Sequence, residues 1–303
     1  MNQDAEPHSL AHIGDHRMDW WNPDFLALLA NRARLHNCRR LLDVGVGDGH
    51  WLASLLRAIE LPREIAVLDF EQHWLERVRA GELHRSTAAQ GCTWEFLHGD
   101  CRAIPSAPDR FDCVTCQTLL MHLPDPAAAL WEFVRVVRPG GVVLVAEPVN
   151  LLNRAPMTAL SFRLRPDAHA RLFCFWRHHE LGMRAAGLGD HSLGAQLASL
   201  FRAAGLVDSR FFCNDCPVVA ETVGGDAALR DHLPPPSAED YRLAALGGAP
   251  AELLAWAEAF FLQPADYLLP KETRHALAEP VLAQPQLIIG IGFKPLDAGT
   301  SLP

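Results

Sequence analysis

The feature that most constrains the fold is a regular alternation of short apolar runs and amphipathic stretches between Arg39 and Leu151. This alternation is typical of βαβ units that build a parallel sheet, because a buried strand is a short apolar run and its crossover helix has one apolar face. The runs expected to form strands are RRLLDV, EIAVLDF, WEFL, FDCVTC and GVVLVAE. Stretches with helical periodicity at 49–60, 72–89 and 126–137 are expected to connect them.

Later segments extend this sheet and interrupt it. We expect a helix at 192–204, a strand at about 206–213 and a last strand from QLIIGIGF at 286–293. The residues at about 150–190 and at 217–284 fall outside the pattern and are expected to form helical cap insertions. The predicted fold class is therefore α/β, a seven-stranded, mostly parallel sheet with helices on both faces plus helical cap insertions.

The domain organisation follows from these elements. Residues 1–38 are expected to form an N-terminal helical segment that acts as a lid. Residues 39–216 and 285–303 would form the core, and 217–284 would leave the sheet and return to it as a cap. The N-terminal prediction rests on a cap-and-proline pair, Asn22-Pro23, followed by helical periodicity. The side chains that recur at helical spacing are Trp20, Trp21, Phe25, Leu28, Leu29, Arg32 and Leu35.

Composition excludes several classes of protein. With 49% hydrophobic and 21% charged residues, the chain is too apolar for a disordered protein. No apolar run approaches the ~20 residues that cross a bilayer, so no membrane partner is expected. The net charge of −9 disfavours a nucleic-acid partner, because phosphate binding relies on clustered Lys and Arg. The stretch 1–19 has no apolar signal core, so we expect a cytoplasmic protein with its eight cysteines reduced.

Two Cys-x-x-Cys spacings, Cys113/Cys116 and Cys213/Cys216, raise the alternative of a zinc site. The first pair lies in an expected strand, where residues three apart point to opposite faces. The second pair falls at a strand end and has no matching second pair. We therefore expect these cysteines to be small buried side chains and expect no metal.

The segment most informative about chemistry is LLDVGVGDGHW at 41–51. A buried strand ends near Asp43, and Gly45, Gly47 and Gly49 then lead into a helix. Glycine lets the backbone turn sharply and approach a ligand closely, and a helix N-terminus presents unpaired N–H groups. The glycine turn therefore predicts a ligand site.

Two common nucleotide motifs do not fit this turn. The dinucleotide-binding pattern G-x-G-x-x-G requires a third glycine at the position of His50. The phosphate-binding loop requires Gly-Lys-Ser/Thr, which does not follow. Neither a dehydrogenase nor a phosphate-loop nucleotide hydrolase is indicated.

The turn instead matches D-x-G-x-G-x-G, which resembles the first motif of the class I S-adenosylmethionine-dependent methyltransferases. Further motifs follow in order over residues 40–147, and the chain is most similar to the small-molecule, ubiquinone-biosynthesis-like branch. The resemblance implies a Rossmann-like core, S-adenosyl-L-methionine as cofactor, S-adenosyl-L-homocysteine as product, and no metal. It also implies that Asp43, Gly45, Gly47 and Gly49 contact the cofactor.

The same resemblance extends to the ends of the next three strands. Asp69 lies 20 residues beyond the last glycine of the turn, where such folds place a carboxylate for the ribose hydroxyls. Phe70 is expected to pack on the adenine, and Asp100 to accept from its amino group, with Cys101 beside it. Gln117 is expected to lie over the cofactor. These residues complete the expected cofactor site.

Methyl transfer from a sulfonium is an in-line displacement, so the protein mainly aligns the reactants and excludes water. A general base is needed when the acceptor arrives protonated, and histidine suits that role. The candidate bases are His122, on the loop after the fourth strand, and the adjacent His178 and His179 in the cap. Adjacent helical residues diverge by about 100°, so at most one of that pair faces the cleft.

The sequence thus predicts a methyltransferase whose acceptor is a small-molecule metabolite with an O, N, S or C acceptor atom. The candidates for contact with the acceptor are Arg17, Trp20, Trp21 and Trp176. Scattered cysteines leave a thiol or metalloid acceptor open, and a non-catalytic subunit that binds S-adenosylmethionine also stays open. A homodimer is open as well, with the insertions serving either as a lid or as the dimer surface.

Overall fold

The computed structural model describes residues 20–154, 164–215, 218–220, 235–269, 281–283 and 287–296. Its centre is a seven-stranded sheet with the order β3-β2-β1-β4-β5-β9-β6. The strands are β1 (Arg40–Val44), β2 (Glu64–Asp69), β3 (Thr93–His98), β4 (Phe111–Gln117), β5 (Val137–Pro148), β6 (Val207–Cys213) and β9 (Leu287–Phe293). The first five pair in parallel, and β9 lies antiparallel between β5 and β6. The predicted seven-stranded, mostly parallel sheet is confirmed.

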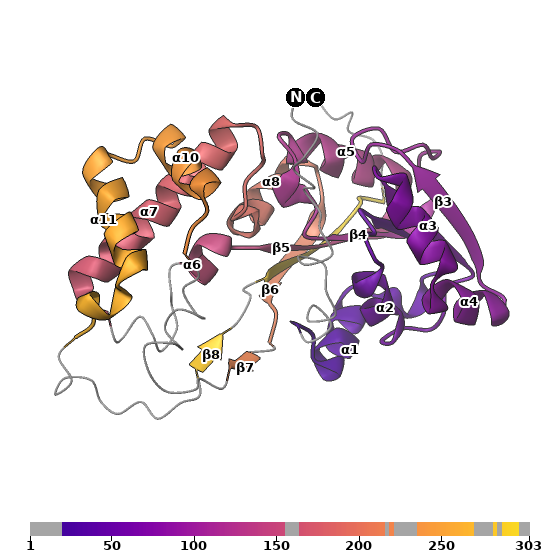
Figure 1. Ribbon diagram of the computed structural model, residues 1–303. Coiled ribbons are helices and arrows are strands. Elements are labelled where there is room, and N and C mark those ends of the chain that lie inside the picture. The colour runs from indigo at the N-terminus through magenta and orange to yellow at the C-terminus, as the bar shows by residue number, and fades with distance from the viewer. Residues whose placement is uncertain are drawn as a thin grey trace.

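Helices follow the strands in the expected alternation (Figure 1). The α-helices of the sheet region are α1 (Pro23–Arg32), α2 (His50–Leu56), α3 (Gln72–Ala80), α4 (Glu82–Ala89), α5 (Pro126–Val136), α6 (Asn150–Arg154) and α8 (Leu197–Ala203). The cap helices are α7 (Pro166–Ala185), α10 (Ala238–Leu246) and α11 (Ala251–Leu262). Short 3-10 helices are η2 (Leu35–Asn37), η3 (Leu120–His122), η5 (Leu193–Gln196) and η6 (Pro264–Tyr267). A separate two-stranded sheet, β7 (Val218–Ala220) with β8 (Val281–Ala283), was not predicted.

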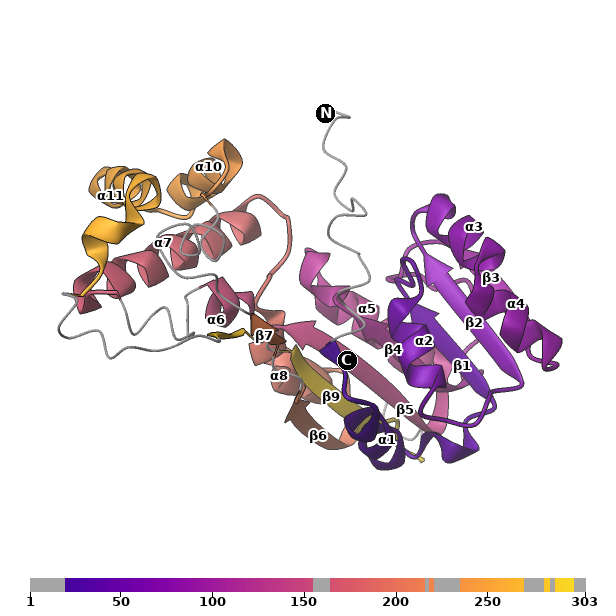
Figure 2. The same ribbon diagram turned by 60° about the horizontal axis from the view of Figure 1, so that its bottom comes forward.

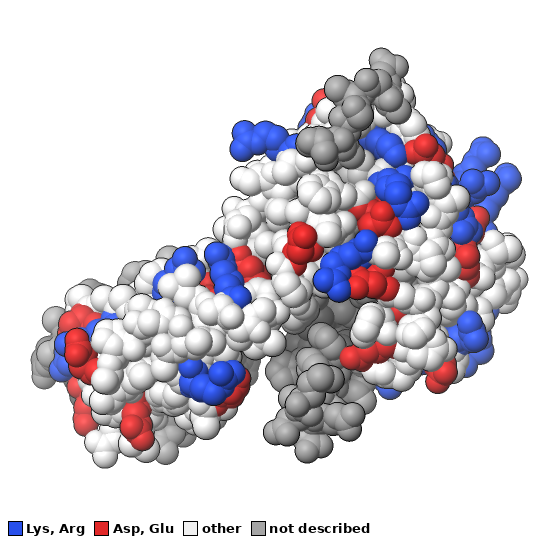
Figure 3. All heavy atoms as spheres, turned by 90° about the horizontal axis from the view of Figure 1, so that it is seen from above, with Lys and Arg blue, Asp and Glu red and all other residues white. Residues whose placement is uncertain are grey.

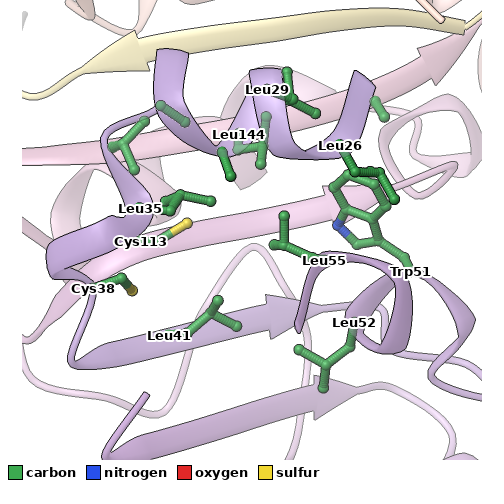
Figure 4. Close-up of a cluster of buried hydrophobic side chains, with 14 of the residues drawn as sticks. Leu26, Leu29, Leu35, Cys38, Leu41, Trp51, Leu52, Leu55, Cys113 and Leu144 are labelled. Carbon is green, nitrogen blue, oxygen red and sulfur yellow. The ribbon is translucent and has the colours of Figure 1, made fainter. Parts of the chain in front are cut away.

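Two hydrophobic clusters cover opposite faces of the seven-stranded sheet. One packs α1, α2 and α3 against side chains such as Leu41 and Leu144 (Figure 4). The other packs α5 and α8 against Leu42 and the alternate side chains of the neighbouring strands. Cys113 belongs to the first cluster and Cys116 to the second, which confirms that these two thiols point to opposite faces. Cys216 lies outside the described residues.

Three element boundaries differ from the sequence prediction. The expected helix at 72–89 is two helices, because Gly81 between them is extended, with φ −77° and ψ 165°. The N-terminal helix ends at Arg32, and Arg34 then takes a left-handed conformation. The last difference is in β5, which begins at Val137, four residues before the expected strand GVVLVAE. Gly140 N donates to Lys294 O there, so the partner segment beyond β9 extends the strand.

The cap helices form a hydrophobic cluster of their own. α7, α10 and α11 lie together at one end of the molecule, beyond the end of β5 (Figures 1 and 2). Their buried contacts centre on Phe175, Trp256 and Phe260. Helical cap insertions are therefore present, whereas the exact domain boundaries and the role of residues 1–38 as a lid stay predictions.

None of the helices in the described ranges is long and apolar enough to cross a bilayer. On the face shown in Figure 3, acidic and basic side chains are interspersed over both the sheet region and the cap.

Candidate active site

The glycine turn connects β1 to α2 through three residues in the left-handed region. Gly45, Gly47 and Gly49 have φ values of +69°, +50° and +84°. A Cβ on Gly45 would lie 2.8 Å from Leu119 Cδ1. Gly45 N and Val46 N both donate to Leu68 O on β2, at 2.7 and 3.2 Å. Glycine is required here because an L side chain adopts this conformation only with strain.

Two aspartates lie under this turn. Asp69 at the end of β2 accepts from Gly47 N over 3.0 Å and from Glu71 N over 3.0 Å. Asp43 on β1 is 1% exposed, and its Oδ2 makes no hydrogen bond within the described part of the chain. Burial and the nearby Asp69 carboxylate raise the pKa of Asp43 well above its usual range. Such a pair suits a ligand that brings a positive charge.

The end of β3 presents the other predicted cofactor residues. Phe70 follows β2 and is 72% exposed, so its ring face is open. Asp100 is paired with Arg102, with 2.6 Å between Oδ2 and Nη2, and this hydrogen bond lowers the pKa of Asp100. Cys101 is buried, and burial raises the pKa of its thiol to about 12. Phe70 and Asp100 therefore follow two adjacent strands, β2 and β3, on one side of β1, while Cys101 is buried.

Side chains from three segments form a hydrogen-bonded chain beside the turn. His50 Nδ1 is 2.8 Å from Asp48 Oδ1, and His50 Nε2 is 3.1 Å from Gln117 Nε2. On the far side of Gln117, Trp21 Nε1 donates to Gln117 Oε1 over 3.2 Å. These hydrogen bonds thus join the glycine turn, the end of β4 and the segment before α1. Gln117 and Trp21 were predicted site residues, whereas Asp48 and His50 were missed.

The loop after β4 is held by an acid that sequence reasoning also missed. Glu147 near the end of β5 is fully buried, and its carboxyl group accepts from Leu119 N, Leu120 N and Met121 N at 2.7–3.2 Å. Burial raises the pKa of Glu147 to about 8, although the three N–H donors oppose this shift. The available signal was an acid at the carboxyl end of an otherwise apolar strand, the same pattern as Asp69.

His122, a predicted base, ends η3 on this loop. Its ring lies edge-on to the ring of His191, with 5.3 Å between centroids. On the backbone, Asp190 N donates to Met121 O over 2.8 Å. The loop is thus clamped between β5 and the segment 187–191, which positions His122 at the carboxyl edge of the sheet.

The other two predicted bases belong to the packing of α7 on α10. His179 is 2% exposed, and its Nε2 is 3.0 Å from Asp240 Oδ1. Burial raises the pKa of Asp240, but hydrogen bonds from His179 and Ser237 outweigh burial and hold that pKa well below its usual range. His178 Nδ1 is 2.9 Å from Gly247 O. Both histidines therefore hold cap elements together, and their catalytic role stays a prediction.

The remaining predicted acceptor contacts are dispersed. Trp176 packs edge-on against His179 in the cap, with 5.4 Å between ring centroids. Trp20 is half-buried before α1, where Asn214 Nδ2 donates to its carbonyl oxygen over 3.4 Å. Arg17 lies outside the described residues. Of the acceptor candidates, the structure brings Trp21 closest to the glycine turn through Gln117.

The cysteines do not form a site within the described ranges. No group of three or more His, Cys, Asp or Glu side chains has a metal-binding arrangement there. Burial raises the pKa of Cys38 to about 12 and also raises the pKa of Cys113 well above its usual range. The exposed thiols, Cys174 on α7 and Cys213 at the end of β6, lie on separate elements.

Comparison with known proteins assigns the core. Residues 41–141 match the family described as a methyltransferase domain. A demethylmenaquinone methyltransferase of Geobacillus sp. (strain WCH70) is 28% identical over 190 residues, which are 62% of this chain and 77% of the relative. The enzyme of the same name from Staphylococcus aureus (strain MRSA252) is 32% identical over 136 residues, which are 44% of this chain. The chain spans about half the length, 54%, of that staphylococcal relative.

Among solved structures, the YcgJ protein of Bacillus subtilis aligns over 90% of this chain and 99% of its own, with a TM-score of 0.49 and 18% identity. The family match covers the glycine turn, both aspartates beneath it and the strand that ends in Gln117. Residues 41–141 therefore form a methyltransferase domain.

Proposed function

We propose that the protein transfers the methyl group of S-adenosyl-L-methionine to a small, partly apolar metabolite of the quinol class, with S-adenosyl-L-homocysteine as the second product. The observation that carries the proposal is the acidic glycine turn, in which Asp69 accepts from Gly47 N above the buried Asp43. The names of the relatives, demethylmenaquinone methyltransferases, support a quinol acceptor over a macromolecule.

The residues present fit this cofactor. The buried, unsatisfied Asp43 Oδ2 is suited to a cationic ammonium group, which would offset the repulsion from Asp69. Asp69 stands at the end of β2, where sheets of this type bind ribose hydroxyls. The exposed Phe70 ring offers a flat surface for a base, and Asp100 lies after the adjacent strand. No metal is needed by this donor set.

When bound, S-adenosyl-L-methionine supplies a methyl group on a positively charged sulfur. The protein's own residues align the two reactants and exclude water, and both effects lower the barrier to an in-line displacement. Trp21 and Gln117 form one wall beside the glycine turn, and the clamped loop 119–122 forms another. Both walls are tied to the sheet by hydrogen bonds, so the acceptor would meet a rigid surface.

The first test is calorimetric titration with S-adenosyl-L-methionine and S-adenosyl-L-homocysteine. The intact protein should bind both, and Asp69→Asn should weaken binding by ~1–3 kcal/mol through loss of a charged partner. Asp167→Ala, on the exposed start of α7, is the matched control and should leave affinity unchanged. Absence of binding by the intact, folded protein contradicts the proposal.

The second test uses a labelled methyl donor. We expect transfer to a 1,4-naphthohydroquinone with a short prenyl chain, and none to a thiol or to arsenite. Transfer to the thiol or arsenite that is lost in Cys174→Ser or Cys213→Ser would favour the soft-nucleophile alternative instead. Binding of the donor without transfer to any acceptor would favour a non-catalytic subunit.

A further inference from the structure

We propose that His50 is a catalytic residue of this enzyme, the general base that takes the proton of the methyl-accepting group, and that the acceptor therefore arrives as a protonated O–H or N–H compound. The inference rests on the proposed methyl transfer and adds the residue and the proton chemistry of the acceptor. It stands on the hydrogen-bonded chain from Asp48 through His50 and Gln117 to Trp21.

The donors and acceptors in this series of hydrogen bonds determine which nitrogen of the His50 ring carries the proton. The Trp21 indole N–H can only donate, so the Gln117 oxygen faces Trp21 and the Gln117 NH₂ faces His50. His50 Nε2 must therefore accept, and its proton must be on Nδ1, which donates to Asp48. In this geometry the single Nε2 lone pair accepts from Gln117, so Gln117 must turn away before that nitrogen can act as a general base.

The position of the ring also suits this role. His50 begins α2 directly after the glycine turn on β1, and Gln117 ends β4. The chain runs from β1 outward to β2 and β3, and from β4 outward to β5, so β1 and β4 flank the point where the strand order reverses. Ligands of open α/β sheets bind in the crevice at that point. The ring is largely enclosed, with 10% of its side chain exposed.

Acidic side chains lie on the glycine-turn side of His50. Asp48 contacts the ring directly, while Asp43 and Asp69 lie beneath the same turn. Gln117 and Trp21, the partners on β4 and before α1, are uncharged. Carboxylates stabilise an adjacent imidazolium and fix its orientation, as in other carboxylate–histidine pairs.

The proposed step balances without a further reactant. The bond to the methyl carbon forms as the carbon–sulfur bond breaks, and the sulfur keeps that electron pair. The attacking atom is the deprotonated oxygen or nitrogen or, in a hydroquinone, a ring carbon conjugated with the deprotonated oxygen. The acceptor's proton moves to His50 Nε2, and the imidazolium later releases it to water. A thiolate or a tertiary amine would arrive without a proton to lose, so these acceptors would not need His50.

Protonation has a structural consequence that can be observed. Once Nε2 carries a proton it can no longer accept from the Gln117 NH₂. Gln117 must turn its oxygen toward His50, and the hydrogen bond from Trp21 is then lost. Proton uptake by His50 is therefore coupled to the contact of Trp21 at the site.

The experiment compares His50→Gln and Asp48→Asn with a control, His84→Gln. His84 lies on α4, and its ring contacts Arg79 O on α3. Nitrogen NMR of the histidine-labelled intact protein should find the His50 proton on Nδ1 at neutral pH. Acidification should give an imidazolium signal at residue 50 together with a change in the indole N–H signal of Trp21. A neutral ring with its proton on Nε2 would overturn the proposal, whatever the acceptor.

Turnover of the naphthohydroquinone is the second readout. His50→Gln should lower kcat about 100-fold or more, the usual range for a lost general base, and should abolish the acid limb of the pH–rate profile. Asp48→Asn should lower kcat by a smaller factor, because the ring loses the carboxylate that fixes its orientation. Affinity for S-adenosyl-L-homocysteine should stay within about threefold in both variants and in the control. Equal loss of this affinity and of kcat would show a structural role and overturn the proposal.

These outcomes separate the two proposals. Failure of the intact protein to bind S-adenosyl-L-homocysteine defeats the proposed function. Intact binding and turnover, with an unchanged pH–rate profile in His50→Gln, defeats only the role of His50.

Discussion

Glu147 and Asp43 are acids that the fold keeps from water at the ends of β5 and β1. Burial is the main cause that raises the pKa of both acids, but their hydrogen-bond partners differ. Glu147 has three N–H donors that bind it to the loop 119–121, whereas Asp43 has one oxygen without a partner in the described chain. Glu147 thus holds a loop in place, whereas Asp43 keeps a buried oxygen that makes no hydrogen bond in the described chain.

Glu147 should make stability fall as pH rises. Its pKa is about 8 in the folded protein against 4.5 in the unfolded chain, so the folded state binds more protons between these values. The free energy of unfolding should therefore decrease from about pH 5 to about pH 8, by at most about 1.4 kcal/mol per pH unit. Urea unfolding of the intact protein and of Glu147→Gln measures this slope, which the variant should reduce.

Glu147→Gln should also cost about 1–3 kcal/mol at every pH, because buried N–H groups lose an acceptor. Glu252→Gln, on the exposed start of α11, is the control and should leave the slope unchanged. Identical slopes in the intact protein and in Glu147→Gln would contradict the raised pKa.

Gly189 and Gly187 provide a matched pair for the clamp on the loop after β4. Both have positive φ, +87° and +73°. A Cβ on Gly189 would lie 2.1 Å from Met121 O, whereas one on Gly187 would have nothing within 4 Å. Gly187→Ala should cost only left-handed strain, about 1–2 kcal/mol, and Gly189→Ala should cost at least about 3 kcal/mol. Equal urea midpoints for the two variants would show that residue 189 is not packed against the loop.

At the scale of elements, α7 and α10 cross with almost no space between their backbones. A Cβ on Gly182 would lie 1.8 Å from Leu243 O, and one on Gly247 would lie 1.8 Å from His178 O. The same crossing brings His179 to Asp240. The glycines therefore set the distance at which the cap histidines find their partners.

Gly182→Ala tests this crossing, because the close packing decides whether the variant is more or less stable than the intact protein. Alanine is favoured over glycine inside a helix by about 1 kcal/mol, so without the crossing the variant would be more stable. We expect it instead to be less stable by more than about 2 kcal/mol in urea unfolding. Ala185→Gly, exposed in the last turn of the same helix, measures the propensity alone and should cost about 0.5–1 kcal/mol. A stabilised Gly182→Ala would refute the close packing.

For the whole molecule, the separation of the cap cluster from the two sheet clusters predicts uneven stability. Amides of β1, β4 and β5 are central in a sheet that is buried on both faces, whereas α10 and α11 pack into the smaller cap cluster. Hydrogen exchange followed by mass spectrometry should show the cap helices exchanging before the central strands, because smaller clusters open at lower free energy. S-adenosyl-L-homocysteine should slow exchange in the glycine turn and the loop 119–122. Exchange of the cap and the sheet as a single unit would contradict this division.

The sequence by itself determined the local elements of this protein. The seven strands of the main sheet, the glycine turn and the acid at the end of β2 were predicted because hydrophobic period, backbone conformation and strand ends depend on residues close together in the chain. The family resemblance rested on the same short segments. The early start of β5 and the small β7–β8 sheet were missed, because strand pairing such as that of Gly140 with Lys294 depends on distant segments. The break at Gly81 was missed because an isolated glycine is tolerated inside a helical pattern.

Only the tertiary structure decided which side chains meet. It joined Asp48 and His50 to Gln117 and Trp21, bound the loop after β4 to Glu147, and placed His178 and His179 in the contact between α7 and α10. Sequence could identify histidines as bases by their chemistry but could not rank fifteen of them by position. The physical reason is that a hydrogen bond requires its atoms to lie within about 3 Å, and for segments far apart in the chain the packing of the sheet and helices sets that distance.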